Sequence, residues 1–167
     1  MVILNYSKII DFDATNWSGI NTTIFFSGCT FGCPGCFNKD IWSFNSGAPF
    51  TKEVMDNFIT KANNKHISGV CILGGEPFQQ DLDILLEFVV RLKKEVGKPI
   101  HIWSGYLYED IISDDKKFRI LQLVDTLVDG QFKMDKKDLN LRYRGSSNQR
   151  VIDVQKSLKN NTIEYAK

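Results

Sequence analysis

Three cysteines lie close together in the first quarter of the chain, and their spacing is typical of ligands for an iron–sulfur cluster. Cys29, Cys33 and Cys36 form the pattern C-x3-C-x2-C, and Phe37 follows the last of them directly. A [4Fe-4S] cluster normally takes four cysteine ligands, one for each iron. A loop with three thiols would hold three irons and leave the fourth open to another ligand.

The same thiols also fit a structural zinc site, which needs four protein ligands. The only other cysteine, Cys71, lies in an apolar segment, where a cysteine usually behaves as a small buried hydrophobic residue. His66 and His101 have no cysteine or histidine partner nearby, so we expect them to be ordinary surface or core residues. Three thiol ligands and one open iron are the preferred interpretation.

A second motif, Gly74-Gly75-Glu76-Pro77, follows the apolar segment 69–73. Two glycines and a proline end any regular element at this point. Glycine also lets backbone groups approach a ligand because no Cβ stands in the way. Taken alone, the motif would be interpreted as a turn that leads into the next helix. Because it follows a three-cysteine loop, it is instead a candidate ligand-binding loop.

The elements around these motifs predict an α/β fold, with the candidate groups on loops at the carboxyl ends of parallel strands. A closed eight-fold βα barrel needs about 250 residues, so we expect a partial barrel with a mostly parallel sheet of about five or six strands. The segment 4–12 is expected to be an edge strand or an arm. Strands are predicted at 21–27, 69–73, 99–103 and 126–128, and helices at 51–65, 81–96, 106–112 and 116–124.

Length and composition predict one domain over residues 1–167, with a polar tail from about residue 155. The 167 residues are 43% hydrophobic and 25% charged, which excludes disorder for the bulk of the chain. A net charge of +1 argues against a nucleic acid partner. No apolar run approaches the roughly 20 residues of a membrane span, and no signal peptide begins the sequence, so we expect a cytoplasmic protein.

The cysteine loop and the Gly74–Pro77 motif together resemble the radical S-adenosylmethionine superfamily. The resemblance implies a [4Fe-4S] cluster on Cys29, Cys33 and Cys36, with S-adenosylmethionine on its open iron. Glycines and Glu76 would lie along the methionine amino group, and the residues around Cys36 along the adenine. The cofactor contacts implied in this way are Gly35, Cys36, Phe37, Gly74, Gly75, Glu76 and Ser104.

Further strings narrow the resemblance to activases of glycyl-radical enzymes, and among them to those of anaerobic ribonucleoside-triphosphate reductase. These strings are CFNKDIW at 36–42, IWSGY at 102–106, VDG at 128–130 and YRGSSNQR at 143–150. The resemblance implies an enzyme that reductively cleaves S-adenosylmethionine and forms a radical on a glycine near the C-terminus of the reductase large subunit. A low-potential donor such as a flavodoxin would supply the electron, and no catalytic side chain is implied beyond the cluster and its ligands.

Two alternatives remain open at this point. One is a radical enzyme that acts on a small molecule, which would need a closed pocket with dedicated polar groups. The other is a non-catalytic iron–sulfur or zinc module. Arg142, Arg144 and Arg150 are candidates to meet a carboxylate of S-adenosylmethionine or an acidic face of the partner, and the alternative for them is a solvated loop.

Overall fold

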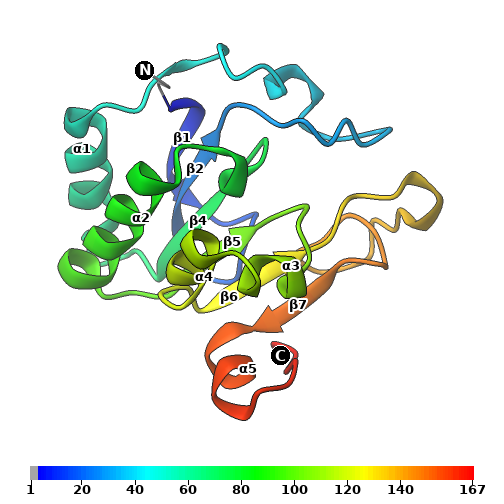
Figure 1. Ribbon diagram of the computed structural model, residues 1–167. Coiled ribbons are helices and arrows are strands. Elements are labelled where there is room, and N and C mark those ends of the chain that lie inside the picture. The colour runs from blue at the N-terminus through cyan, green and yellow to red at the C-terminus, as the bar shows by residue number, and fades with distance from the viewer. Residues whose placement is uncertain (1–3) are drawn as a thin grey trace.

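The computed structural model describes residues 4–167, which form one seven-stranded mixed sheet with the order β3-β1-β2-β4-β5-β6-β7 (Figure 1). The four central strands are parallel, whereas β1, β3 and β7 run antiparallel to their neighbours. The strands are β1 Asn5–Asp13, β2 Asn21–Phe26, β3 Ala48–Pro49, β4 Gly69–Gly74, β5 Ile100–Trp103, β6 Thr126–Asp129 and β7 Arg150–Asp153.

The register of the parallel strands brings their carboxyl ends to one edge of the sheet. Phe26 pairs with Gly74 between β2 and β4, and Trp103 pairs with Val128 between β5 and β6. The residues that follow each strand therefore start from neighbouring points. The cysteine loop and the loop 131–149 leave from there and project to the side of the molecule opposite α1 and α2 (Figure 1).

Side-chain caps define where several helices begin. The Thr51 hydroxyl accepts a hydrogen bond from the Val54 N–H, and the Asp81 carboxylate caps the next helix in the same way. The α-helices are α1 Lys52–Ala62, α2 Leu82–Arg91, α3 Tyr108–Ile112, α4 Asp115–Leu121 and α5 Val154–Asn160. The shorter helical turns are the 3-10 turns η1 Lys39–Ile41, η2 Pro77–Gln79 and η4 Met134–Lys136 and the π-helical turn η3 Leu92–Val96.

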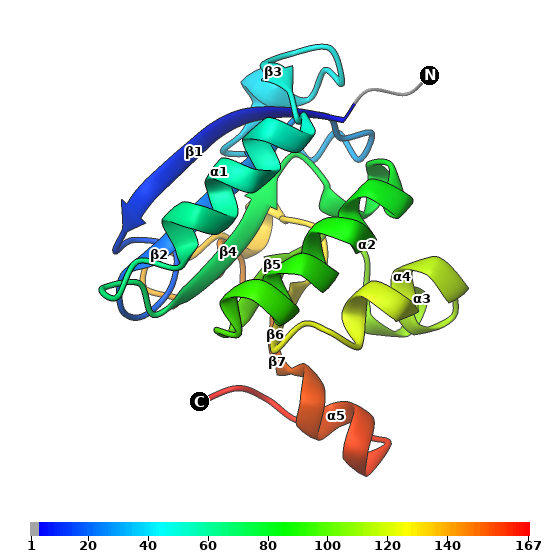
Figure 2. The same ribbon diagram turned by 90° about the vertical axis from the view of Figure 1, so that its left-hand side faces the viewer.

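The main hydrophobic core lies between the sheet and the helices α1, α2 and α4, which cover one of its faces (Figure 2). Phe50 and Phe88 form its centre, with ring centroids 5.1 Å apart in an edge-to-face arrangement. A smaller cluster of Phe25, Cys71 and Leu73 lies on the opposite face. Successive strand residues point to opposite faces, which places Cys71 in the smaller cluster and its neighbour Ile72 in the main core.

The strands and helices expected between residues 21 and 128 are confirmed. The segment expected to be an edge strand or an arm forms β1, but β1 lies between β3 and β2, so the short β3 is the edge on that side. The count of five or six strands is wrong, because the sheet has seven. The missed strands are β3, which has two residues, and β7, which holds only two apolar residues and carries no clear alternation. A further helix, α5, begins at Val154, and Tyr165 bridges back to Ile152 beside β7.

None of the helices within residues 4–167 combines the length and the apolar character that a membrane span requires. The longest regular helices, α1 and α2, have 11 and 10 residues and each turns one face to the core.

Candidate iron–sulfur and S-adenosylmethionine site

The cysteine loop starts directly at the carboxyl end of β2. Gly28 has a φ of 109°, a region that favours glycine, and turns the chain out of the sheet. Its N–H donates to the Ile41 carbonyl at 2.8 Å, and the Cys29 N–H donates to the Trp42 carbonyl at 2.9 Å. These two bonds fix the base of the loop, and the tip carries Cys33 and Cys36.

The three thiols line one cavity of about 590 Å³ at this edge of the sheet. Of the other residues implied by the resemblance, Phe37, Gly74, Gly75 and Ser104 also line it, whereas Gly35 and Glu76 do not. The rest of the lining includes strand residues, the glycine after β6 and residues of the loop 131–149: Phe25, Trp103, Gly130, Gln131, Phe132, Leu139, Tyr143 and Arg144.

A site for a single metal ion and a site for a cluster place different demands on these three thiols. In the part of the chain that the structure describes, no three histidine, cysteine, aspartate or glutamate side chains converge closely enough to hold one metal ion. A cubane cluster binds each thiolate at a different iron, so its ligands share a cavity without meeting at one point. Cys29, Cys33 and Cys36 do line one cavity.

Burial and nearby backbone N–H groups have opposite effects on the pKa of the Cys29 and Cys33 thiols. Burial raises the pKa of the Cys29 thiol to about 11, and it also raises the pKa of Cys33. A backbone N–H group lies against each sulfur: that of Phe31 at Cys29, that of Phe132 at Cys33, and that of Asn38 at Cys36. Such donors stabilise thiolates, which are the form that binds iron.

The two glycines of the Gly74–Pro77 motif pack the second loop directly against the first. Gly74 has a φ of 132°, and a Cβ there would lie 2.1 Å from the Phe26 carbonyl oxygen. A Cβ at Gly75 would lie 2.3 Å from the carbonyl oxygen of Gly28. Any larger residue would separate the glycine loop from the cysteine loop.

Glu76 points beneath this loop and is fully buried. Its carboxylate accepts hydrogen bonds from the Ser104 hydroxyl at 2.7 Å and from the Gly105 N–H at 2.7 Å. Burial raises the pKa of Glu76 to about 7, and the bonds from Ser104 and Gly105 partly offset that effect. Glu76 therefore joins the glycine loop to the end of β5, and Ser104 is its partner.

An aromatic stack that the sequence interpretation missed supports the far wall. The ring of Trp17 lies between those of His101 and Tyr143, with centroid distances of 4.3 Å and 3.9 Å. The Trp103 indole N–H donates to the Tyr143 carbonyl at 2.7 Å. Tyr143 has a positive φ of 67°, and these contacts hold it and the adjoining Arg144 at the cavity.

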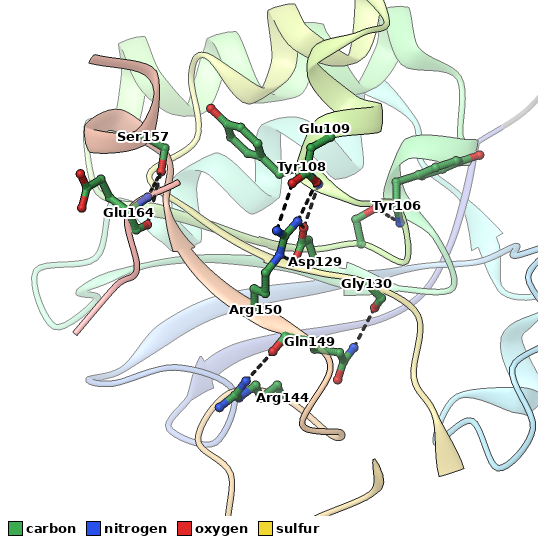
Figure 3. Close-up of polar contacts among 11 residues, drawn as sticks. Tyr106, Tyr108, Glu109, Asp129, Gly130, Arg144, Gln149, Arg150, Ser157 and Glu164 are labelled. Carbon is green, nitrogen blue, oxygen red and sulfur yellow. Dashed lines mark hydrogen bonds and ion pairs between the residues drawn. The ribbon is translucent and has the colours of Figure 1, made fainter. Parts of the chain in front are cut away.

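The three candidate arginines have different surroundings. Arg144 lines the cavity, and Arg142 is exposed and lies over the Tyr143 ring. Arg150 does not line the cavity, and its guanidinium points toward Asp129 and Glu109 (Figure 3). Its Nε donates to Asp129 at 3.0 Å, and its two terminal nitrogens donate to Glu109 at 3.1 Å and 2.7 Å.

The remaining cysteine and the histidines lie outside the cavity lining. Cys71 is fully buried in β4, and burial raises the pKa of its thiol to about 12. His66 is exposed, and His101 is buried against Trp17.

Comparison with known proteins decides the family. A family model described as a 4Fe-4S single cluster domain matches residues 15–152. The anaerobic ribonucleoside-triphosphate reductase-activating protein of Escherichia coli K12 is 40% identical over 152 residues, which cover 89% of this chain and 97% of that protein. The chain belongs to this family of activating proteins.

Members from distant sources match over the same extent. The activating protein of Vibrio cholerae is 36% identical over 87% of this chain and 96% of its own length. The activating protein of Enterobacteria phage T4 is 31% identical over 89% of this chain and 93% of its own length. The resemblance to the activating-protein family, which the strings at 36–42, 102–106, 128–130 and 143–150 indicated, is confirmed.

Proposed function

We propose that this protein activates an anaerobic ribonucleoside-triphosphate reductase by forming a glycyl radical on it. The observation that carries the proposal is one cavity lined both by the three thiols and by the two glycines at the end of β4, Gly74 and Gly75. Membership of the activating-protein family, with its 4Fe-4S single cluster domain, supports the same chemistry. When bound, a reduced [4Fe-4S] cluster supplies the electron that cleaves S-adenosylmethionine, and the resulting radical removes a hydrogen atom from glycine.

In this proposal Cys29, Cys33 and Cys36 are the cluster ligands, and each sulfur has a backbone N–H beside it. Gly74 and Gly75 offer their backbone to the methionine end of S-adenosylmethionine. Their carbonyls can accept from its ammonium group because no side chain shields them.

The adenine end is placed on the other side of the cysteine loop, beside Cys36 and Phe37, which line the cavity; Gly35 precedes them in the chain but does not line the cavity itself. The Phe37 ring is 60% exposed and packs against Phe132 with a centroid distance of 5.1 Å, so it presents a face to the cavity. The hydrogen bond between Glu76 and Ser104 fixes the loop that carries the two glycines. No acid–base pair is assigned, because the cofactor supplies the reactive chemistry and the protein orients it and excludes water.

The partner in this proposal is the large subunit of the reductase, through its C-terminal glycine region, and a flavodoxin is the electron donor. We place the protein in the cytoplasm, where thiols stay reduced. The chain is proposed to act as one radical S-adenosylmethionine domain over residues 1–167. Its sequential parallel strands with helices on one face are proposed to be a partial βα barrel.

The experiment is anaerobic reconstitution with iron and sulfide, followed by reduction and addition of S-adenosylmethionine. Chromatography should detect 5′-deoxyadenosine, in an amount that depends on the presence of the reductase. A protein with a full cluster that produces no 5′-deoxyadenosine would favour the non-catalytic module. The same amount of 5′-deoxyadenosine with and without the reductase, and no radical on the reductase, would be a different outcome. It would favour a small-molecule substrate.

A further inference from the structure

Two consecutive glutamines after the glycine motif hold the residues on both sides of Cys29. The Gln79 side-chain oxygen accepts from the Thr30 N–H at 2.8 Å, and its amide nitrogen donates to the Thr30 hydroxyl at 2.9 Å. The amide nitrogen of Gln80 donates to the Gly28 carbonyl at 3.1 Å. The glutamines lie about fifty positions after Gly28 and Thr30 in the chain. The contacts therefore join two loops that are far apart in the sequence.

The glutamines are themselves held in place. Gln80 is buried, and its amide also donates to the Glu76 carbonyl at 2.9 Å. Gln79 lies 3.4 Å from the Tyr106 hydroxyl, and the Tyr106 ring packs edge-on against Phe31 with a centroid distance of 4.9 Å. The contact of Gln79 with Thr30 is therefore connected to buried Gln80 and to the aromatic pair of Tyr106 and Phe31.

The cysteine loop has little else to fix it on this side. Within residues 4–167, Thr30, Phe31 and Gly32 form no backbone-to-backbone hydrogen bond. A Cβ at Gly32, which has a φ of 63°, would meet no atom within 4 Å, so this turn is open to solvent. The Thr30 N–H depends on Gln79 for its partner.

We infer that Gln79 is a positioning residue that sets where Cys29 lies relative to the glycine loop. It connects the first cluster ligand to the loop proposed to hold the methionine end of S-adenosylmethionine, so that both loops keep one spacing. Gln80 supports it from the Gly28 side. The inference rests on the proposed function in taking Cys29 as a cluster ligand and the glycine loop as the site of the methionine end of S-adenosylmethionine.

The test uses the full chain with its cluster reconstituted anaerobically, in four forms: wild type, Gln79→Leu, Gln79→Glu and the control Gln155→Leu. Leucine keeps the volume of Gln79 but neither donates nor accepts. Glutamate keeps oxygens that accept from both the N–H and the hydroxyl of Thr30. Gln155 is a matched control because its amide also makes two hydrogen bonds, to the carbonyls of Gln122 and Val124 near the amino end of β6.

Three quantities are measured: the rate at which a ferrous chelator removes iron, the electron paramagnetic resonance spectrum of the reduced cluster with and without S-adenosylmethionine, and the unfolding midpoint. We expect Gln79→Leu to lose iron about tenfold faster than wild type, the order expected for one or two net hydrogen bonds. Its spectral change on adding S-adenosylmethionine should be altered. Gln79→Glu should stay within about twofold of wild type, and both leucine variants should have similar unfolding midpoints.

Iron loss from Gln79→Leu at the rate of Gln155→Leu, with a wild-type spectrum, would overturn the inference. Equally fast loss from Gln79→Glu would also overturn it, because the hydrogen bonds to Thr30 would then not be the cause. A wild-type protein that takes up no cluster would refute the proposed function itself, and that result is distinct from a difference among variants.

Discussion

Arg150 is the residue whose removal separates a structural role from a ligand-binding role most clearly. Its guanidinium pairs with the carboxylate of Asp129, which is completely buried, and with that of Glu109 (Figure 3). These two carboxylates raise the pKa of Arg150, and its hydrogen bonds lower the pKa of Glu109. We predict that Arg150→Met destabilises the fold without weakening the binding of S-adenosylmethionine.

The expected loss follows from what remains around Asp129. Without Arg150, the Asp129 carboxylate keeps the hydrogen bond from the Tyr108 N–H at 2.8 Å but no positive charge. Removing one partner of a buried ion pair costs about 3–5 kcal/mol. In a chain of this size that loss lowers the unfolding midpoint by about 6–20 °C.

Thermal and urea unfolding measure this difference, with Arg91→Met as the matched control. Arg91 also bridges two carboxylates, but Asp56 and Glu95 are 50% and 45% exposed. Exposed pairs contribute at most about 1 kcal/mol, so Arg91→Met should lower the unfolding free energy much less. The double variant Arg150→Met with Asp129→Asn should recover most of the loss, because no buried charge is left unpaired.

Two results would refute this reasoning. The first is an Arg150→Met protein as stable as Arg91→Met. The second is normal stability with lost affinity for S-adenosylmethionine, measured on the loaded protein at a temperature where both forms are folded. That outcome would place Arg150 at the ligand after all.

Two further predictions concern a cluster ligand and acid stability. Cys33→Ala should abolish cluster assembly, whereas Cys71→Ala should keep its iron and cost only about 1 kcal/mol of packing; equal iron loss from both would contradict the three-ligand assignment. Burial lowers the pKa of His101 to about 4, so the unfolded chain binds its proton more readily and stability falls as the pH drops from about 6.5 toward 4. Replacing His101 with Phe keeps a ring beside Trp17. The drop in unfolding free energy between pH 7 and pH 4, measured by urea unfolding, should then be smaller by about 3 kcal/mol. An unchanged drop would contradict the burial argument.

The sequence was sufficient for features that depend on local pattern. The strand at 21–26 is rich in β-branched and aromatic residues and is closely followed by Gly28, and the helix at 82–91 has an aspartate cap, so both were predictable. The cysteine spacing and the two glycines were sufficient to indicate a superfamily, and the strings at 36–42, 102–106, 128–130 and 143–150 narrowed it to the activating proteins. Both motifs line one cavity because parallel strands bring their loops to the same edge.

Features that depend on distant contacts were not predictable. Glu76 was expected to line the ligand, but Ser104, 28 residues later, accounts for its inward orientation. The inward pairing of Arg150 requires Asp129 on the neighbouring antiparallel strand β6, and β7 itself was missed. The clamp of Gln79 on Thr30 likewise joins residues that only the folded sheet brings together.

The most direct test of the proposed function is electron paramagnetic resonance of the reductase after incubation with this protein, a reductant and S-adenosylmethionine under anaerobic conditions. A glycyl-radical doublet that requires all three reagents, and that is lost with Cys33→Ala, is the predicted result. A reductase that shows no radical, although the protein carries its cluster and cleaves S-adenosylmethionine, would contradict the account.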